Sequence, residues 1–98
     1  MTAWDDLEAL AAHEAQLVID GRFSELAAVY ERREALLAAL PQPLPPPAIE
    51  PLRRALSVQE ATQTALRARR DAVASELGRL QRGRNGVQGY ARTFDARR

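Results

Sequence analysis

A stripe of regularly spaced positions between Ile49 and Arg84 constrains the fold of this chain more than any other feature. Eleven residues follow one another at alternating steps of three and four, which places them on one face of an α-helix. Seven of them are aliphatic, and the stripe predicts a helix over about residues 48–84, roughly 50 Å long at about 1.5 Å per residue. The eleven positions are Ile49, Leu52, Leu56, Gln59, Gln63, Leu66, Arg70, Val73, Leu77, Leu80 and Arg84.

The first part of the chain also favours helix, but Gly21 leaves two possibilities. Residues 2–40 are rich in Ala, Leu and Glu, which are good helix formers. One possibility is a pair of helices broken at Gly21, with Asp20 capping the second. The other is one continuous or kinked helix, since a 3.6-residue period starting at Trp4 still reaches Leu40. We favour the continuous helix because its length matches that of the second helix.

A proline-rich connection, residues 41–47, separates the two helical parts. Proline fixes φ and removes a backbone donor, so we expect no helix to cross this segment. We predict an all-α protein in which the connection folds the two helices into a long antiparallel hairpin. Leu40 would then meet Ile49, Leu26 would meet Gln63, and Trp4 would lie near Arg84.

The glycines near the C-terminus predict the end of the second helix. Gly83 and Gly86 favour a helix stop. We therefore predict one helical-hairpin domain, residues 1–84, followed by a flexible basic tail, residues 85–98.

Charge is distributed unevenly along the chain. Residues 1–50 hold three Arg and nine acidic residues, a net charge of −6, whereas residues 51–98 hold eleven Arg and four acidic residues, a net charge of +7. Two oppositely charged helices that pair with each other would explain this division. A basic surface for nucleic acid is the other interpretation. We do not expect nucleic-acid binding, because a chain of net charge +1 has no broad field that attracts phosphates.

The sequence offers few groups for catalysis. There is no cysteine, and His13 is the single histidine. Metal motifs on helices use residues four apart, which His13 and Glu14 are not. We therefore predict no enzymatic activity, no metal site and no cofactor. No run of about 18 apolar residues and no signal-peptide layout occurs, so we expect a cytoplasmic protein that does not span a membrane.

Polar residues at core-facing positions form a predicted polar core layer. The layer comprises Arg33, Gln59, Gln63 and Arg70. These residues could fix the register of the helices, as buried polar residues do in coiled coils, or extend their polar ends to solvent. We expect Arg70 to reach Glu14 or Asp20 across the hairpin.

A two-helix hairpin leaves part of its apolar stripe open to solvent. Such a surface favours pairing with a second copy or capture of an amphipathic helix, although the stripe could also be buried within one chain. The candidate binding residues are Leu66, Val73, Leu77 and Leu80.

The layout and several residues resemble the flagellar type III export chaperones of the FlgN/FliT class. The likeness covers Asp20-Gly21-Arg22-Phe23-Ser24-Glu25-Leu26, then Arg33 with Leu36-Leu37, and a late Gly89-Tyr90. In the second half it adds Leu52, Leu56, Leu66, Val73, Leu80 and Arg84. The chain is shorter than is usual in the class, and we expect its tail to lack an extended regulatory helix.

The resemblance implies a chaperone that binds an amphipathic helix of a flagellar hook-filament junction or cap protein. It would prevent premature assembly of this client and deliver it to the gate or ATPase components of the export apparatus. Tyr90 would contact that apparatus, because the class carries a late tyrosine. The rival interpretation is a structural coiled-coil or homodimerisation module with no export role, and a homodimer is also compatible with the chaperone.

Overall fold

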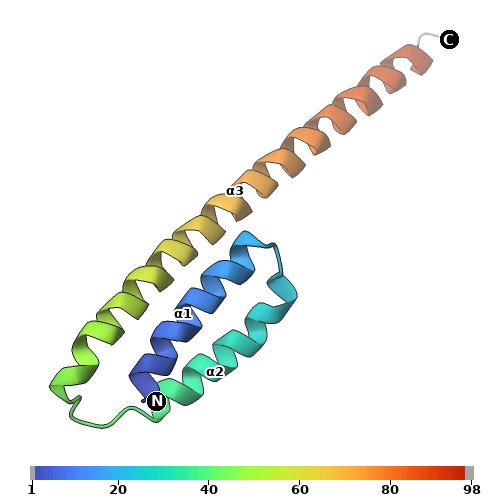
Figure 1. The fold of residues 1–98 in the computed structure, drawn as a ribbon. Helices are drawn as coiled ribbons and strands as arrows, with labels where there is room; N and C mark the ends of the chain where they lie inside the picture. Colours follow the sequence, from blue (N-terminus) through green and yellow to red (C-terminus); the bar gives the residue numbers. More distant parts are fainter. Residues whose placement is uncertain (1, 97–98) are drawn as a thin grey trace. The chain divides into compact units, whose positions relative to one another are not determined.

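The computed structural model describes the backbone of residues 2–96 and the side chains of residues 2–84, and this part of the chain is helical without strands (Figure 1). The predicted all-α class is therefore confirmed. The chain divides into two compact units, Met1–Leu66 and Arg67–Arg98. The elements are α1 (Ala3–Ile19), the short 3-10 helix η1 (Phe23–Glu25), α2 (Leu26–Ala38) and α3 (Pro46–Ala96).

Both ends of α1 are capped by local interactions. At its start, Thr2 Oγ1 accepts a hydrogen bond from the backbone N–H of Asp5 at 3.3 Å. Asp5 and Asp6 place negative charge in the first turn, where it interacts favourably with the helix dipole. At its end, the N–H of Arg22 donates to Leu17 O and the N–H of Gly21 donates to Val18 O. This pair of bonds is a Schellman motif, which ends the helix after Ile19.

The expected continuous helix over residues 2–40 is wrong, and the alternative of a break at Gly21 is correct. Gly21 adopts φ 72°, a left-handed conformation that costs other residues about 1–2 kcal/mol. Asp20 does not cap the second helix; it is the C-cap of α1 and accepts a hydrogen bond from Gln16 Nε2 at 3.0 Å. The Schellman motif ends the helix before Gly21 although the apolar period continues past it. Two separate helices can each bury their own part of the apolar face, so the period does not require one continuous helix.

The proline-rich connection lies between α2 and α3, and α3 begins inside it. Pro46 is the first residue of α3, where the missing N–H has no partner to lose. Because α3 begins at Pro46, Pro51 lies inside the helix. Proline has no N–H, so one backbone carbonyl of the preceding turn lacks its usual hydrogen-bond donor. The peptide bond between Gln42 and Pro43 is cis.

The first unit is a three-helix bundle formed by α1, α2 and the part of α3 up to Leu66. Its central cluster consists of buried residues of α1 and α2, and Leu10 and Leu66 pack against it. Burial of these apolar side chains is the main source of stability for a bundle of this size. The cluster residues are Leu17, Val18, Leu26 and Val29.

The break at Gly21 changes how the helices pair. Because α1 and α2 turn back on each other, α1 runs parallel to the first part of α3 (Figure 1). Glu8 of α1 pairs with Arg54, and Glu14, further along α1, meets Gln63, further along α3. The predicted antiparallel pairing of residues 2–19 with α3 is therefore wrong. Near the connection, Leu37 and Leu52 line one hollow.

The second unit contains the remainder of α3. The helix continues to Ala96, so the predicted helix stop near Gly83 is wrong. A glycine inside a helix costs only about 1 kcal/mol relative to alanine, and no proline follows to block the hydrogen bonds. The flexibility of residues 85–98 and the domain boundary at residue 84 stay predictions.

Candidate functional site

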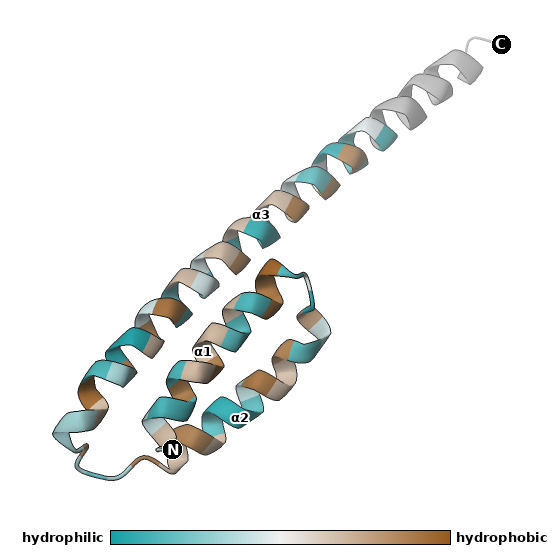
Figure 2. Cartoon of the chain, in the orientation of Figure 1, coloured by the Kyte–Doolittle hydropathy of each residue, from teal (hydrophilic) through white to brown (hydrophobic). Residues whose placement is uncertain are grey.

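The second unit presents apolar side chains to solvent. Val73 is 54% exposed, Leu77 60% and Leu80 63%. Steps of four and three residues between them place all three on one face of α3. We call these three residues the apolar seam. Apolar residues alternate with hydrophilic ones along this part of the helix (Figure 2).

The fourth predicted binding residue, Leu66, has a different environment. Leu66 is half-buried and packs against the core cluster of the first unit. It therefore contributes to the bundle of the first unit. Its predicted part in binding a partner stays a prediction.

Arginines surround the apolar seam. Residues 67–84 hold six Arg and two acidic residues, a net charge of +4. Arg70 and Arg84 occupy the positions of the stripe that flank the seam on either side along the helix, and both are exposed. Arg79, on another face, pairs with Glu76 at 2.7 Å.

A buried carboxylate joins the three helices of the first unit. Glu14 of α1 is fully buried, and its Oε1 accepts a hydrogen bond from Arg33 Nη2 of α2 at 2.6 Å. Gln63 Nε2 of α3 approaches the other oxygen at 3.4 Å. The guanidinium of Arg33 also lies 5.7 Å from the ring centre of Tyr30, within range of a cation–π interaction. This arrangement satisfies a charge that would otherwise be costly to bury.

The predicted polar core layer is thus divided between the two units. Arg33 and Gln63 meet at Glu14, and Gln59 lines a hollow together with Arg33. Arg70 lies in the second unit and is exposed. Its expected contact with Glu14 or Asp20 stays a prediction.

The first unit contains an apolar hollow of about 340 Å³ near the proline-rich connection. Sequence reasoning missed this hollow, although the leucines at both ends of the connection were a signal for it. Its apolar walls come from all three helices, and its polar groups are Arg33 and Gln59. The apolar residues are Leu7, Leu37, Leu40, Leu52, Ala55 and Leu56.

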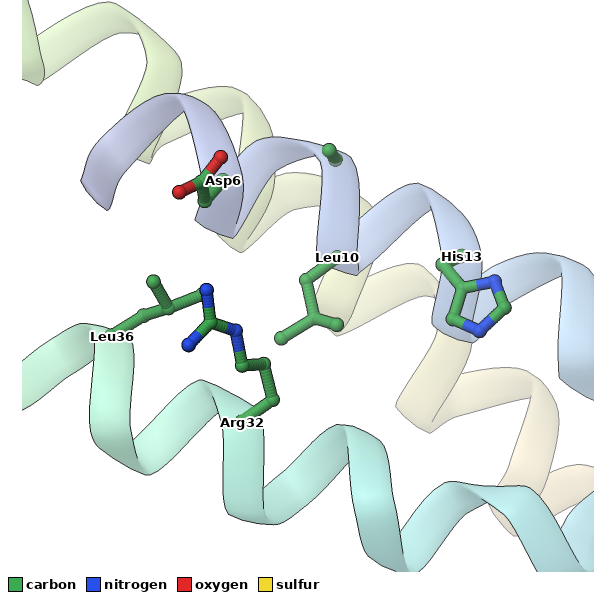
Figure 3. A pocket seen from close by; sticks show the side chains of 6 residues that line it. Asp6, Leu10, His13, Arg32 and Leu36 are labelled. Atoms are coloured by element: carbon green, nitrogen blue, oxygen red, sulfur yellow. The ribbon is translucent and has the colours of Figure 1, made fainter. Parts of the chain in front are cut away.

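A second hollow, of about 270 Å³, lies between α1 and α2. Figure 3 shows Leu10 and His13 on α1 facing the side of α2 that carries Arg32 and Leu36. His13 is exposed. Among the described residues, no group of three or more acidic or histidine side chains could hold a metal ion.

An exposed ion pair joins α1 to α3 near the start of both helices. Arg54 Nε donates a hydrogen bond to Glu8 Oε2 at 2.8 Å, and this bond raises the pKa of the Arg54 guanidinium. Both side chains are largely open to solvent, so the pair contributes much less to stability than a buried one.

The family described as Flagellar protein FliT matches residues 1–92. The chain belongs to the FliT family. No match appears among curated proteins or among solved structures. The FliT family consists of flagellar export chaperones, so the predicted resemblance, the chaperone class and the link to flagellum assembly are confirmed.

The FliT family is a chaperone family and not an enzyme family. Within the described residues, no helix is both long enough and apolar enough to cross a membrane. Tyr90, the predicted contact with the export apparatus, lies outside the residues whose side chains are described.

Proposed function

We propose that this FliT-family protein binds an amphipathic helix of a flagellar hook-filament junction or cap protein through the apolar seam. The observation that carries the proposal is the exposure of Val73, Leu77 and Leu80 in a member of a chaperone family. An exposed row of aliphatic side chains on a helix is suited to an amphipathic partner, whose apolar face would gain burial there.

The chaperone effect follows from competition for one surface. An amphipathic helix that packs on the seam cannot use the same apolar face to assemble with other flagellar subunits. The protein would hold its client in the cytoplasm in this way and deliver it to the gate or ATPase components of the export apparatus. Tyr90 is the residue we propose for that contact, and no cofactor takes part.

The proposal is tested by capture of purified client proteins. The full chain should retain hook-filament junction or cap proteins that carry their terminal helices and should lose them when those helices are deleted. Leu77→Glu should abolish capture, because a charge would replace an aliphatic side chain in the contact. Ser75→Glu is the matched control, since Ser75 is exposed and about 200° around the helix from Leu77.

Two outcomes would contradict the proposal. One is failure of the full chain to capture any of these clients. The other is equal capture by the Leu77→Glu and Ser75→Glu variants, which would place the contact elsewhere. A stable homodimer that binds no flagellar protein would favour the alternative, a structural coiled-coil module.

A further inference from the structure

The arginines around the apolar seam indicate which charge its partner should carry. This inference rests on the proposed function. Val73, Leu77 and Leu80 occupy successive core positions of a heptad repeat. Arg70 holds the core position before them and Arg84 the core position after them. Arg70 and Arg84 are 14 residues apart, roughly 21 Å along an α-helix. Arg67 lies at a position that borders the seam at the same end as Arg70.

The arginines at the ends of the seam form no ion pair in the part of the chain whose side chains are described. No salt bridge joins Arg67, Arg70 or Arg84 to an acidic side chain there, although Asp71 follows Arg70 in the sequence. Of the two acidic residues in 67–84, Glu76 already pairs with Arg79. A helix that covers the seam would bring its own side chains close to Arg70 and Arg84 and would partly exclude water from them. Opposite charges on the partner are then favourable, and like charges are costly.

A second copy of this segment does not meet that requirement. Residues 67–84 carry a net charge of +4, so two copies side by side would repel each other. In a parallel pair, Arg70 would face Arg70 and Arg84 would face Arg84. A nucleic acid would satisfy the arginines but would leave the three aliphatic side chains of the seam without an apolar partner.

We propose that the seam takes an amphipathic helix whose apolar face is bordered by acidic residues at both ends, about four turns apart. The apolar face covers Val73, Leu77 and Leu80, and the carboxylates lie beside Arg70 and Arg84. The apolar contact provides burial, whereas the two charged ends set the register and exclude basic helices.

Designed peptides test this inference with the full chain. One labelled 21-residue helical peptide carries a leucine seam with Glu at both ends. The comparison peptides replace the Glu residues by Gln, replace them by Lys, or keep them and replace the leucines by Ser. Fluorescence anisotropy should show binding of the first peptide and about tenfold or greater weakening for each of the others. High salt should weaken the binding of the Glu peptide, because it screens the carboxylates from Arg70 and Arg84.

Charge reversal in the protein gives the complementary test. Arg70→Glu with Arg84→Glu should reverse the preference, so that the Lys peptide binds better than the Glu peptide. Arg79→Glu with Arg82→Glu makes the same change in net charge on another face and should preserve the preference for Glu. Circular dichroism should show the same helix content in both variants.

Four results would overturn the inference. They are equal binding of the Glu and Gln peptides, undiminished binding of the Ser peptide, tighter binding of a DNA duplex than of the Glu peptide at the same salt, and self-association that Leu77→Glu abolishes. Failure of this inference differs from failure of the proposed function. Equal capture of a flagellar client by the wild type and by the Arg70→Glu, Arg84→Glu variant refutes only the acidic partner. Binding of the Glu peptide without capture of any flagellar client refutes only the proposed function.

Discussion

Glu14 of α1 is fully buried and receives the guanidinium of Arg33 from α2 at 2.6 Å. Arg33 is itself only 13% exposed, so this pair is largely shielded from solvent. Helices packed by aliphatic side chains alone can slide with little loss of burial, whereas this pair has one favourable arrangement. We therefore expect the pair to fix the register of α1 against α2, and Gln63 of α3 reaches the same carboxylate.

Removal of one partner of this pair should destabilise the bundle strongly. Arg33→Met leaves the Glu14 carboxylate buried without its cation and should lower the free energy of unfolding by about 3 kcal/mol. Replacement of both residues by leucine should cost less than Arg33→Met alone, because no buried charge remains. Chemical denaturation of the single and double variants measures these differences. A double variant that loses the sum of the two single losses would show that the pair is not coupled.

The exposed pair of Glu8 and Arg54 should behave differently. Arg54→Met should change the free energy of unfolding far less than Arg33→Met, because solvent screens the pair at the surface. High salt should remove the small loss of stability caused by Arg54→Met, because it screens the interaction of Arg54 with Glu8. A loss of stability equal to that of Arg33→Met, unchanged by salt, would refute the assignment of this pair to the surface.

Gly21 and Gly83 should respond to alanine in opposite directions. Gly21 has φ 72°, so Gly21→Ala should lower the free energy of unfolding by about 1 kcal/mol. Gly83 lies inside α3 with open space where a Cβ would be, so Gly83→Ala should stabilise the helix by a similar amount. Thermal unfolding followed by circular dichroism distinguishes the two. Stabilisation by Gly21→Ala would instead support a helix that continues through residue 21.

Leu17 and Ile19 test where the core lies. Leu17 is 1% exposed in the central cluster, and Leu17→Ala should cost about 3 kcal/mol. Ile19, two residues further on, is 73% exposed, and Ile19→Ala should change stability by no more than about 0.5 kcal/mol. Denaturant titration of both variants measures the contrast. Equal losses would mean that the face of α1 packed against α2 and α3 has been assigned wrongly.

The candidate site was partly predictable from the sequence. Period and composition alone placed Val73, Leu77 and Leu80 on one helix face, and side-chain exposure then distinguished them from Leu66, which packs on the bundle core. The sequence also marked Arg33 and Gln63 as polar residues on core-facing positions. It did not identify Glu14 as the residue that brings them together, because the partner of a buried charge depends on which helices face each other.

The sequence by itself determined the helical class, the separation of two helical parts by proline and the apolar stripe of α3, since each follows from interactions between residues close together in the chain. It also carried the likeness to the FliT family, which the match over residues 1–92 confirms. Only the tertiary structure decided that α1 runs parallel to α3 and that Glu14, Arg33 and Gln63 converge. The reason is physical: the chain turns back at Gly21, which has φ 72°, and this turn changes the partners of α1 while it leaves the local apolar period unchanged.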